Sequence, residues 1–297
     1  MASKSPMPLL ISVPHGGLWV PPEVEPFCRL DLPAILKDGD TWAQHLYNLG
    51  GRVLACTRFP VARAVVDVNR AADDRPPENP DGVVKTVTVD NEPVWQNPQG
   101  LSPGQVEFLL ERYYEPYHRR LARASQNKSV LLGLDCHTML DRAPVISSHP
   151  GEQRPLVCLS NGGDERGEAL TGPVTAPPAL LRALGEALER QLEDEGIEKG
   201  VPVVELNRPF RGGYIIQRHG SVAREGGRNN MKIGPGYKRK GSRPLPWIQV
   251  EFNRTLYLSA DPAVAEPRGE AAFRVNDLRM RFVQALETFF QGDFSRT

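Results

Sequence analysis

The sequence has no excess of either charge, no long apolar run and only four cysteines, and each absence argues against a class of protein. Lysine plus arginine and aspartate plus glutamate both number 36, so no overall field attracts the chain to nucleic acid or to a membrane surface. The first apolar run, residues 9–13, is short and follows no basic segment, which argues against a signal peptide and a membrane span. We therefore expect a cytoplasmic protein that has neither nucleic acid nor a membrane as a partner.

The cysteines are scattered along the chain, and no two of them form a CxxC pair. They are Cys28, Cys56, Cys136 and Cys158. This pattern is typical of reduced thiols and argues against a disulfide framework or a thiolate zinc site. A chain of 297 residues can bury a large core, as one large α/β domain or as two small ones. We interpret residues 1–297 as one domain, since no internal repeat is present.

Short apolar segments alternate with amphipathic ones along the chain, which predicts a central mixed, mostly parallel sheet between helices, a three-layer α/β fold. Strands are expected at residues 8–13, 52–57, 62–68, 130–138, 155–159, 202–206 and 247–252. Helices are expected at residues 40–49, 105–125, 177–195 and 271–290. Residues 71–104 are rich in Pro, Asp and Asn, and we expect an irregular loop with a small hairpin around residues 83–89.

Two of the expected strands end in a histidine. His15 follows the strand at residues 8–13, and His137 ends the strand at residues 130–138. In open α/β sheets, ligands bind beyond the carboxyl ends of the strands, so each imidazole is expected at the mouth of a site. A lone histidine there is as often structural, bonded to nearby backbone. Two histidines and a carboxylate, however, form a common catalytic zinc site.

Two acids on the loop after the first strand can complete such a site. Asp38 and Asp40 form an Asp-Gly-Asp sequence, and either one reaches the metal if the loop folds over His15. The alternative for Asp40 is to cap the helix that follows. A metal hydrolase also needs a base, and Glu251 lies in an apolar strand where an unpaired charge is costly. Glu251 therefore either faces a cleft or pairs with an arginine inside the protein.

Three arginines accompany glycine turns and acidic motifs: Arg63, Arg70 and Arg211. A guanidinium can hold a substrate carboxylate in a bidentate fork or polarise a carbonyl oxygen. Residues 223–243 form a further basic, glycine-rich stretch, with seven cations against one acid. We interpret this stretch as a solvated loop rather than a nucleic-acid site, and we expect it to border the cleft and to fold toward acidic substrates.

Six motifs occur in an order that spans residues 8–260. They are Ser12-Val13-Pro14-His15-Gly16-Gly17, Asp38-Gly39-Asp40, Arg63 with Asp67-Val68-Asn69-Arg70, Asp135-Cys136-His137-Thr138, Pro209-Phe210-Arg211-Gly212-Gly213-Tyr214 and Gln249-Val250-Glu251. The set resembles the N-formylglutamate amidohydrolase family, which is distantly related to the zinc carboxypeptidases and aspartoacylase. The resemblance implies their central mixed sheet flanked by helices. The family pattern is shorter where this chain carries the basic stretch.

The resemblance also implies roles for individual residues. It implies metal ligation by His15, His137 and an acid, for which Asp40 is a better match than Asp38, and it implies Glu251 as general base and acid.

On the substrate side, Asn69 and Arg70 resemble the pair with which the carboxypeptidases grip a terminal carboxylate. Arg63 would polarise the carbonyl, and Arg211, Gly213 and Tyr214 would contact the substrate.

The implied activity is that of a metal-dependent amidohydrolase acting on a small acidic N-acyl amino acid. The best single candidate is N-formyl-L-glutamate, giving formate and L-glutamate. Zinc suits two histidines and a carboxylate, although iron, cobalt or nickel can replace it. The alternatives are a deacylase or peptidase for another small N-acyl amino acid, and a non-catalytic binding protein of the same fold. The sequence leaves open the acyl group, the metal, the oligomeric state and the role of residues 223–243.

Overall fold

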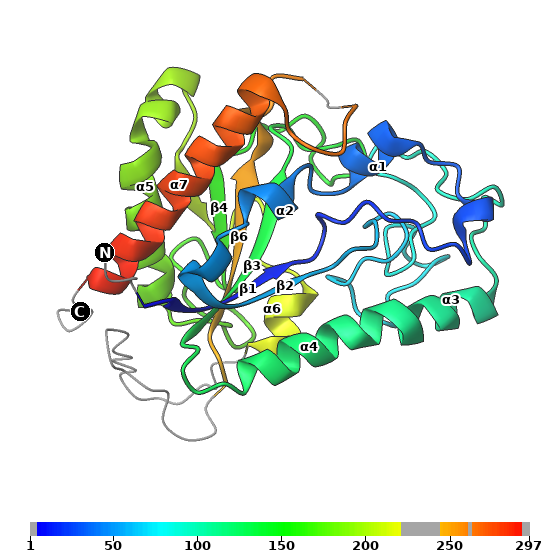
Figure 1. Cartoon of the computed structure of the whole chain (residues 1–297), viewed down its shortest axis with the longest axis horizontal. Helices are drawn as coiled ribbons and strands as arrows, with labels where there is room; N and C mark the ends of the chain where they lie inside the picture. The colour runs from blue at the N-terminus through cyan, green and yellow to red at the C-terminus, as the bar shows by residue number, and fades with distance from the viewer. Residues whose placement is uncertain (1–4, 221–243, 261–262, 293–297) are drawn as a thin grey trace.

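The computed structural model describes residues 5–220, 244–260 and 263–292 of the chain (Figure 1). In this part, strands form one sheet in the order β2-β1-β3-β6-β4-β5. The strands are β1 Met7–Val13, β2 Val53–Arg58, β3 Leu132–Met139, β4 Val157–Ser160, β5 Val204–Leu206 and β6 Trp247–Asn253. Neighbouring strands run parallel, except that β4 and β6 are antiparallel. The mixed, mostly parallel sheet expected from the sequence is confirmed.

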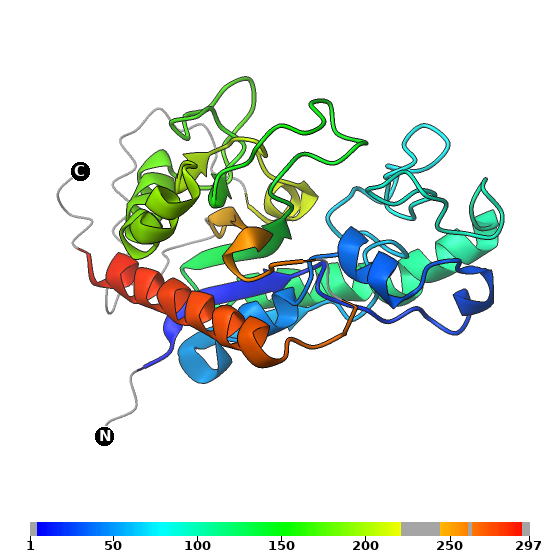
Figure 2. The same cartoon turned by 90° about the horizontal axis from the view of Figure 1, so that it is seen from above.

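Helices cover both faces of the sheet, which gives three layers (Figures 1 and 2). The helices are α1 Leu32–Asp38, α2 Ala43–Leu46, α3 Pro103–Leu109, α4 Glu115–Ser125, α5 Pro178–Lys199, α6 Tyr214–His219 and α7 Gly269–Gln291. Leu9 and Ile11 of β1 join a core with α2, α5 and α7. Leu10 faces the opposite core, with α4 and α6. None of the described helices has the length and apolar content needed to cross a bilayer.

Residues 62–68, expected as a strand, form turns instead. The backbone N–H groups of Val65 and Val66 donate to the Ala62 carbonyl, at 2.9 and 3.1 Å. The apolar side chains of this segment are nevertheless buried in the core shared with α4. The apolar run therefore reflects burial rather than strand pairing. The resulting turn carries Arg63 and Asp67 to the pocket described below.

Two expected helices differ from the structure in continuity or length. The helix expected at residues 105–125 contains a π-helical turn, Leu110–Tyr114, between α3 and α4. The helix expected at residues 177–195 continues through Gly196, where an added Cβ would lie 2.3 Å from a valine side chain. It ends at Gly200, whose φ of 65° needs the left-handed conformation that glycine tolerates.

Two further expected elements are shorter in the structure than the sequence predicted. The helix expected at residues 40–49 is only α2, preceded by Trp42 with a φ of 56°. The hairpin expected around residues 83–89 is reduced to an isolated bridge between Val87 and Pro93. The basic stretch at residues 223–243 lies outside the described residues.

Candidate active site

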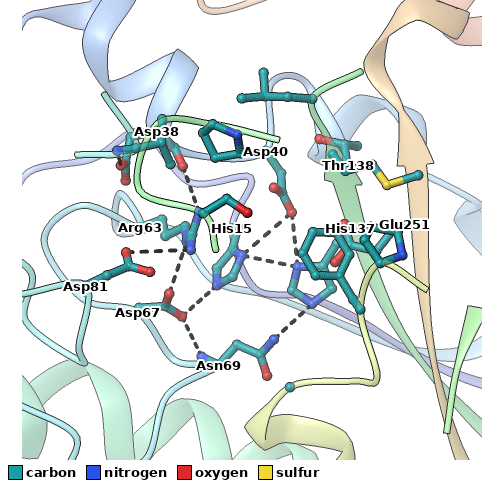
Figure 3. Close-up of a pocket in the computed structure, with 18 of the residues that line it drawn as sticks. His15, Asp38, Asp40, Arg63, Asp67, Asn69, Asp81, His137, Thr138 and Glu251 are labelled. Atoms are coloured by element: carbon teal, nitrogen blue, oxygen red, sulfur yellow. Dashed lines mark hydrogen bonds and ion pairs between the residues drawn. The ribbon is translucent and has the colours of Figure 1, made fainter. Parts of the chain in front are cut away.

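A pocket of about 430 Å³ lies at the carboxyl ends of β1, β3 and β6 (Figure 3). Side chains alternate across a strand, and the core under α2, α5 and α7 takes the even-numbered apolar residues of β3 and β6. His137 and Glu251 therefore point to the opposite face, toward α4 and α6. Loops that follow β1 and β2 form one side of the pocket, and residues 209–213 form part of the other.

His15, Asp40 and His137 converge in this pocket. Their ligating atoms all lie within 4.8 Å of one another, and all three residues are buried. The two histidine Nδ1 atoms are 3.1 Å apart. Asp40 Oδ2 lies 3.2 Å from Nδ1 of His137 and 3.7 Å from Nδ1 of His15. The structure thus brings together the three side chains that the sequence nominated as metal ligands.

A second carboxylate lies behind each histidine. Asp67 Oδ1 is 2.7 Å from Nε2 of His15, and Asp135 Oδ2 is 2.8 Å from Nε2 of His137. These bonds fix each ring with its Nδ1 atom toward the common space, as second carboxylates do behind metal-binding histidines. Sequence reasoning did not assign these roles. Asp135 and His137 are two residues apart on one strand, so their side chains lie on the same face, and this spacing could have indicated their contact. Nothing in the sequence links Asp67 to His15.

The electrostatics of the three nominated ligands suit a cation. Burial lowers the pKa of His15 despite the charge of Asp67. Burial opposes ionisation of Asp40, but the hydrogen bond with His137 and the charge of His15 lower the pKa of Asp40 to about 2. In His137, the charges of Asp135 and Glu251 overcome burial and raise the pKa well above its usual value. The facing Nδ1 atoms can share only one proton, which a cation bound between them would displace.

The structure separates the two acids of the Asp-Gly-Asp sequence. Asp38 accepts hydrogen bonds from Lys85 Nζ, at 2.8 and 3.1 Å, and both side chains are fully buried. Asp38 is therefore engaged away from the histidines. The Asp40 side chain does not cap α2, so the capping alternative is wrong. Its second oxygen, Oδ1, lies 3.6 Å from Nη2 of Arg254, a pocket residue that sequence reasoning missed.

Glu251 faces the pocket from β6, opposite His137 in the sheet register. Its Oε1 accepts a hydrogen bond from Gln249 Nε2 at 2.8 Å. Burial, together with the charges of Asp40 and Asp135, raises the pKa of Glu251 to about 7 against the opposing charge of His137. Glu251 lines the pocket, as the cleft alternative requires. Among the described residues no arginine forms an ion pair with it within 4 Å, although the charge of Arg154 is near enough to act on it. A carboxyl with this pKa can accept and return a proton near neutral pH.

Arg63 and Arg70 line the pocket but are engaged with its acids. Arg63 Nε donates to Asp67 Oδ2 at 3.0 Å, and its Nη1 donates to the Asp38 carbonyl at 3.1 Å. Arg70 Nη2 donates to Asp81 Oδ2 at 2.6 Å. Both guanidiniums therefore brace carboxylates on the side of the pocket that carries His15.

Asn69 and Gly213 lie against each other at the pocket. Asn69 Nδ2 is 3.4 Å from Nε2 of His137, and its Oδ1 accepts from the Ile215 N–H at 2.8 Å. The Gly213 N–H donates to Gln249 Oε1 at 2.7 Å. An added Cβ on Gly213 would lie 2.1 Å from the Asn69 amide, so this close approach requires glycine.

The last two nominated substrate residues behave differently. Arg211 is exposed and lines the pocket. Tyr214 is absent from the lining formed by the described residues, and its ring packs on His118 at 5.7 Å between centroids and under the guanidinium of Arg218. Tyr214 is therefore not placed at the pocket, because it begins α6 and faces α4 instead.

Comparison with solved structures places the chain in a known fold. The N-formylglutamate amidohydrolase of Ralstonia eutropha JMP134 matches with a TM-score of 0.68 at 22% identity, over 95% of this chain and 94% of that one. The Atu2144 gene product of Agrobacterium tumefaciens matches with a TM-score of 0.57 at 15% identity, over 97% of this chain and 92% of that one. The fold is therefore that of a known group of three-layer α/β proteins.

Comparison with sequences identifies the family. Residues 7–234 match the sequence model of the family described as N-formylglutamate amidohydrolase. An N-formylglutamate deformylase of Pseudomonas aeruginosa is 31% identical over 223 residues, which is 72% of this chain and 75% of that protein. One of Pseudomonas putida is 31% identical over 150 residues, or 46% and 54%. The chain belongs to the N-formylglutamate amidohydrolase family, whose members are hydrolases of carbon–nitrogen bonds.

Proposed function

We propose that this protein hydrolyses N-formyl-L-glutamate to formate and L-glutamate with one divalent metal ion, preferably zinc, held by His15, Asp40 and His137. The observation that carries the proposal is the convergence of two Nδ1 atoms and one carboxylate oxygen within 4.8 Å. The donor set is that of catalytic zinc sites, which keep a position open. The names of the two Pseudomonas deformylases support the choice of substrate.

A divalent ion in this position supplies Lewis-acid chemistry, because it makes water more acidic and polarises a carbonyl oxygen. Glu251 supplies the proton transfers. Its carboxylate accepts a proton from the attacking water and then gives it to the amide nitrogen as the carbon–nitrogen bond breaks. A pKa of about 7 lets one carboxyl perform both transfers near neutral pH.

The remaining pocket residues orient the substrate. We assign the α-carboxylate of the substrate to Asn69 and Arg70. Arg211 and Gly213, which line the pocket, contact the substrate at its mouth. Arg63 acts on the formyl oxygen or, through Asp67, on the orientation of His15.

The proposal is tested by measuring formate release from N-formyl-L-glutamate by the purified protein. We expect turnover to stop after dialysis against a chelator and to return with one equivalent of zinc per chain. Iron, cobalt and nickel are added separately to identify the preferred metal. N-acetyl-L-glutamate and N-formyl-L-leucine test the acyl group and the side chain. If the protein binds N-formyl-L-glutamate but no added metal supports turnover, the proposal is contradicted, and the protein is a binding protein of this fold.

A further inference from the structure

Most cations that line the pocket are neutralised by a neighbouring carboxylate. Four have such a partner within 4 Å: Lys37 with Asp90, Arg63 with Asp67, Arg70 with Asp81, and Arg254 with Asp40. Two lining cations have none among the described residues. Arg211 is exposed, whereas the Arg154 residue is only 7% exposed.

Arg154 is poorly satisfied for a buried guanidinium. Its Nη1 atom donates to the Leu140 carbonyl at 3.4 Å, which is long for a hydrogen bond. Its Nε atom is buried and has no hydrogen-bond partner in the described structure. Burying a charge without an ion-pair partner is unfavourable, and burial lowers the pKa of Arg154 against the opposing charge of Glu251, which lies beyond 4 Å. An unsatisfied buried group calls for an explanation, and a ligand that engages the guanidinium from the pocket supplies one.

The surroundings of Arg154 hold its guanidinium in place. The Arg154 N–H donates to the Asp141 carbonyl at 2.8 Å, which fixes the backbone just before β4. The guanidinium carbon lies 4.8 Å from the centre of the Phe210 ring, in cation–π geometry. A planar fork held over an aromatic ring matches a carboxylate better than a flexible ammonium does.

We propose that Arg154 binds the side-chain carboxylate of the substrate and so makes the pocket selective for dicarboxylic N-acyl amino acids. This inference rests on the proposed function and deepens it. The substrate brings two negative charges into a pocket that already holds Asp40 and Glu251. Arg70 is already paired with Asp81, so Arg154 is the buried cation whose charge is available for the second carboxylate.

The test compares kcat/KM for N-formyl-L-glutamate and N-formyl-L-glutamine, which differ only in the side-chain carboxylate. We expect kcat/KM of the wild type to be about 10- to 150-fold higher for N-formyl-L-glutamate, which corresponds to the net contribution of one hydrogen bond to a charged group. In Arg154→Gln the preference should fall to within a few-fold, because kcat/KM for N-formyl-L-glutamate falls more than kcat/KM for N-formyl-L-glutamine. An unchanged preference in the variant would overturn the inference. The α-amide of N-formyl-L-glutamate supplies a second comparison. If Arg154→Gln instead removes the preference for N-formyl-L-glutamate over this α-amide, Arg154 binds the α-carboxylate, and the inference is overturned.

The melting temperature of Arg154→Gln distinguishes a role of Arg154 in substrate binding from a role in the stability of the fold. Because the buried charge of Arg154 has no ion-pair partner within 4 Å among the described residues, we expect Arg154→Gln to melt at or above the wild-type temperature. Arg281→Gln is the control outside the pocket, since Arg281 pairs with Asp194 and Asp277, and it should leave the substrate preference unchanged. A lower melting temperature for Arg154→Gln, with equal losses on both substrates, would identify a structural arginine.

Binding measurements keep the inference testable if the proposed function fails. Calorimetry compares glutarate with glutaric acid monoamide on the wild type and on Arg154→Gln. We expect the wild type to bind glutarate more tightly and the variant to lose that difference. A wild type without turnover but with this result would overturn the proposed function alone. Equal glutarate preference in both proteins would overturn the role of Arg154.

Discussion

The two sides of the pocket differ in how they treat charge. The side formed by residues 38–85 holds a continuous network in which each buried charge meets its opposite, and Figure 3 shows the part of this network around Arg63. Lys85 Nζ joins Asp38 to Asp81 at 2.8 Å each, and Arg63 joins Asp67 to the Asp38 carbonyl. We call this the paired side. The side formed by residues 154, 211 and 251, the unpaired side, carries charges that form no ion pair within 4 Å in the described structure, although Arg154 and Glu251 act on each other over a longer distance.

The difference separates the charges that hold the pocket in shape from those that act on the substrate. On the paired side, Asp67 also bonds to Nε2 of His15, so the network ends on a nominated metal ligand. Partners that satisfy each other hold a fixed arrangement, and Arg70, whose side chain is 36% exposed, is the paired residue that we assign to the substrate carboxylate. On the unpaired side, Glu251 and Arg154 are costly when the pocket is empty, and a substrate can recover that cost. The following predictions test this division.

Glu251→Gln should produce the largest effect, because it removes the proton carrier of the unpaired side. We expect kcat to fall by about 10²- to 10⁴-fold, the share typical of general acid–base catalysis. The variant should keep its metal content and melting temperature, since glutamine preserves the shape and the contact with Gln249. Wild-type turnover by the metal-loaded variant would show that Glu251 is a buried structural acid.

The pH dependence supplies a second readout of the same residue. A base must be ionised to act, so kcat/KM should decline as the pH falls through the pKa of Glu251, which burial raises to about 7. A cation held by the nearby ligands would lower this pKa, so the acid limb of the metal-loaded enzyme should lie at or below pH 7. An acid limb that persists unchanged in Glu251→Gln would assign it to another group.

The sequence predicted the elements whose signals are local. Strand ends placed His15 and His137 at one edge of the sheet, and an isolated acid in an apolar strand indicated Glu251. The three layers followed from the alternation of apolar and amphipathic segments. The resemblance favoured Asp40 over Asp38, but the physical reason is visible only in three dimensions, because Lys85 engages Asp38 away from the histidines.

Prediction from the sequence was wrong or incomplete where the outcome depends on tertiary contacts and burial. Residues 62–68 read as a strand, since buried turns and buried strands have the same apolar composition. Asp67 reaches His15 across 52 positions, a contact that no spacing rule anticipates. Arginines are mostly exposed, so the burial of Arg154 had no signature in the sequence. Tyr214 was assigned to the substrate because it belongs to a motif, whereas its ring lies on α4.

Lys85→Met tests the paired side and should affect stability first. The substitution leaves the fully buried Asp38 without its cation, and breaking one partner of a buried pair costs about 3–5 kcal/mol. We therefore expect a clear loss in the free energy of unfolding, measured by denaturant titration. Adding Asp38→Asn to Lys85→Met should recover part of this loss. Equal stability of Lys85→Met and Arg154→Gln would contradict the division into paired and unpaired sides.

Arg70→Lys should produce the smallest effect and sharpens the comparison from the other direction. Arg70 is assigned to the substrate α-carboxylate, yet its Nη2 is bonded to Asp81 and its side chain is 36% exposed. Lysine keeps the charge and loses the fork, and exposed ion pairs contribute about 1 kcal/mol or less. We expect KM for N-formyl-L-glutamate to rise by less than about tenfold and kcat to change less than KM. If kcat falls more than KM rises, Arg70 acts in the transition state, and the assignments of Arg63 and Arg70 must be exchanged.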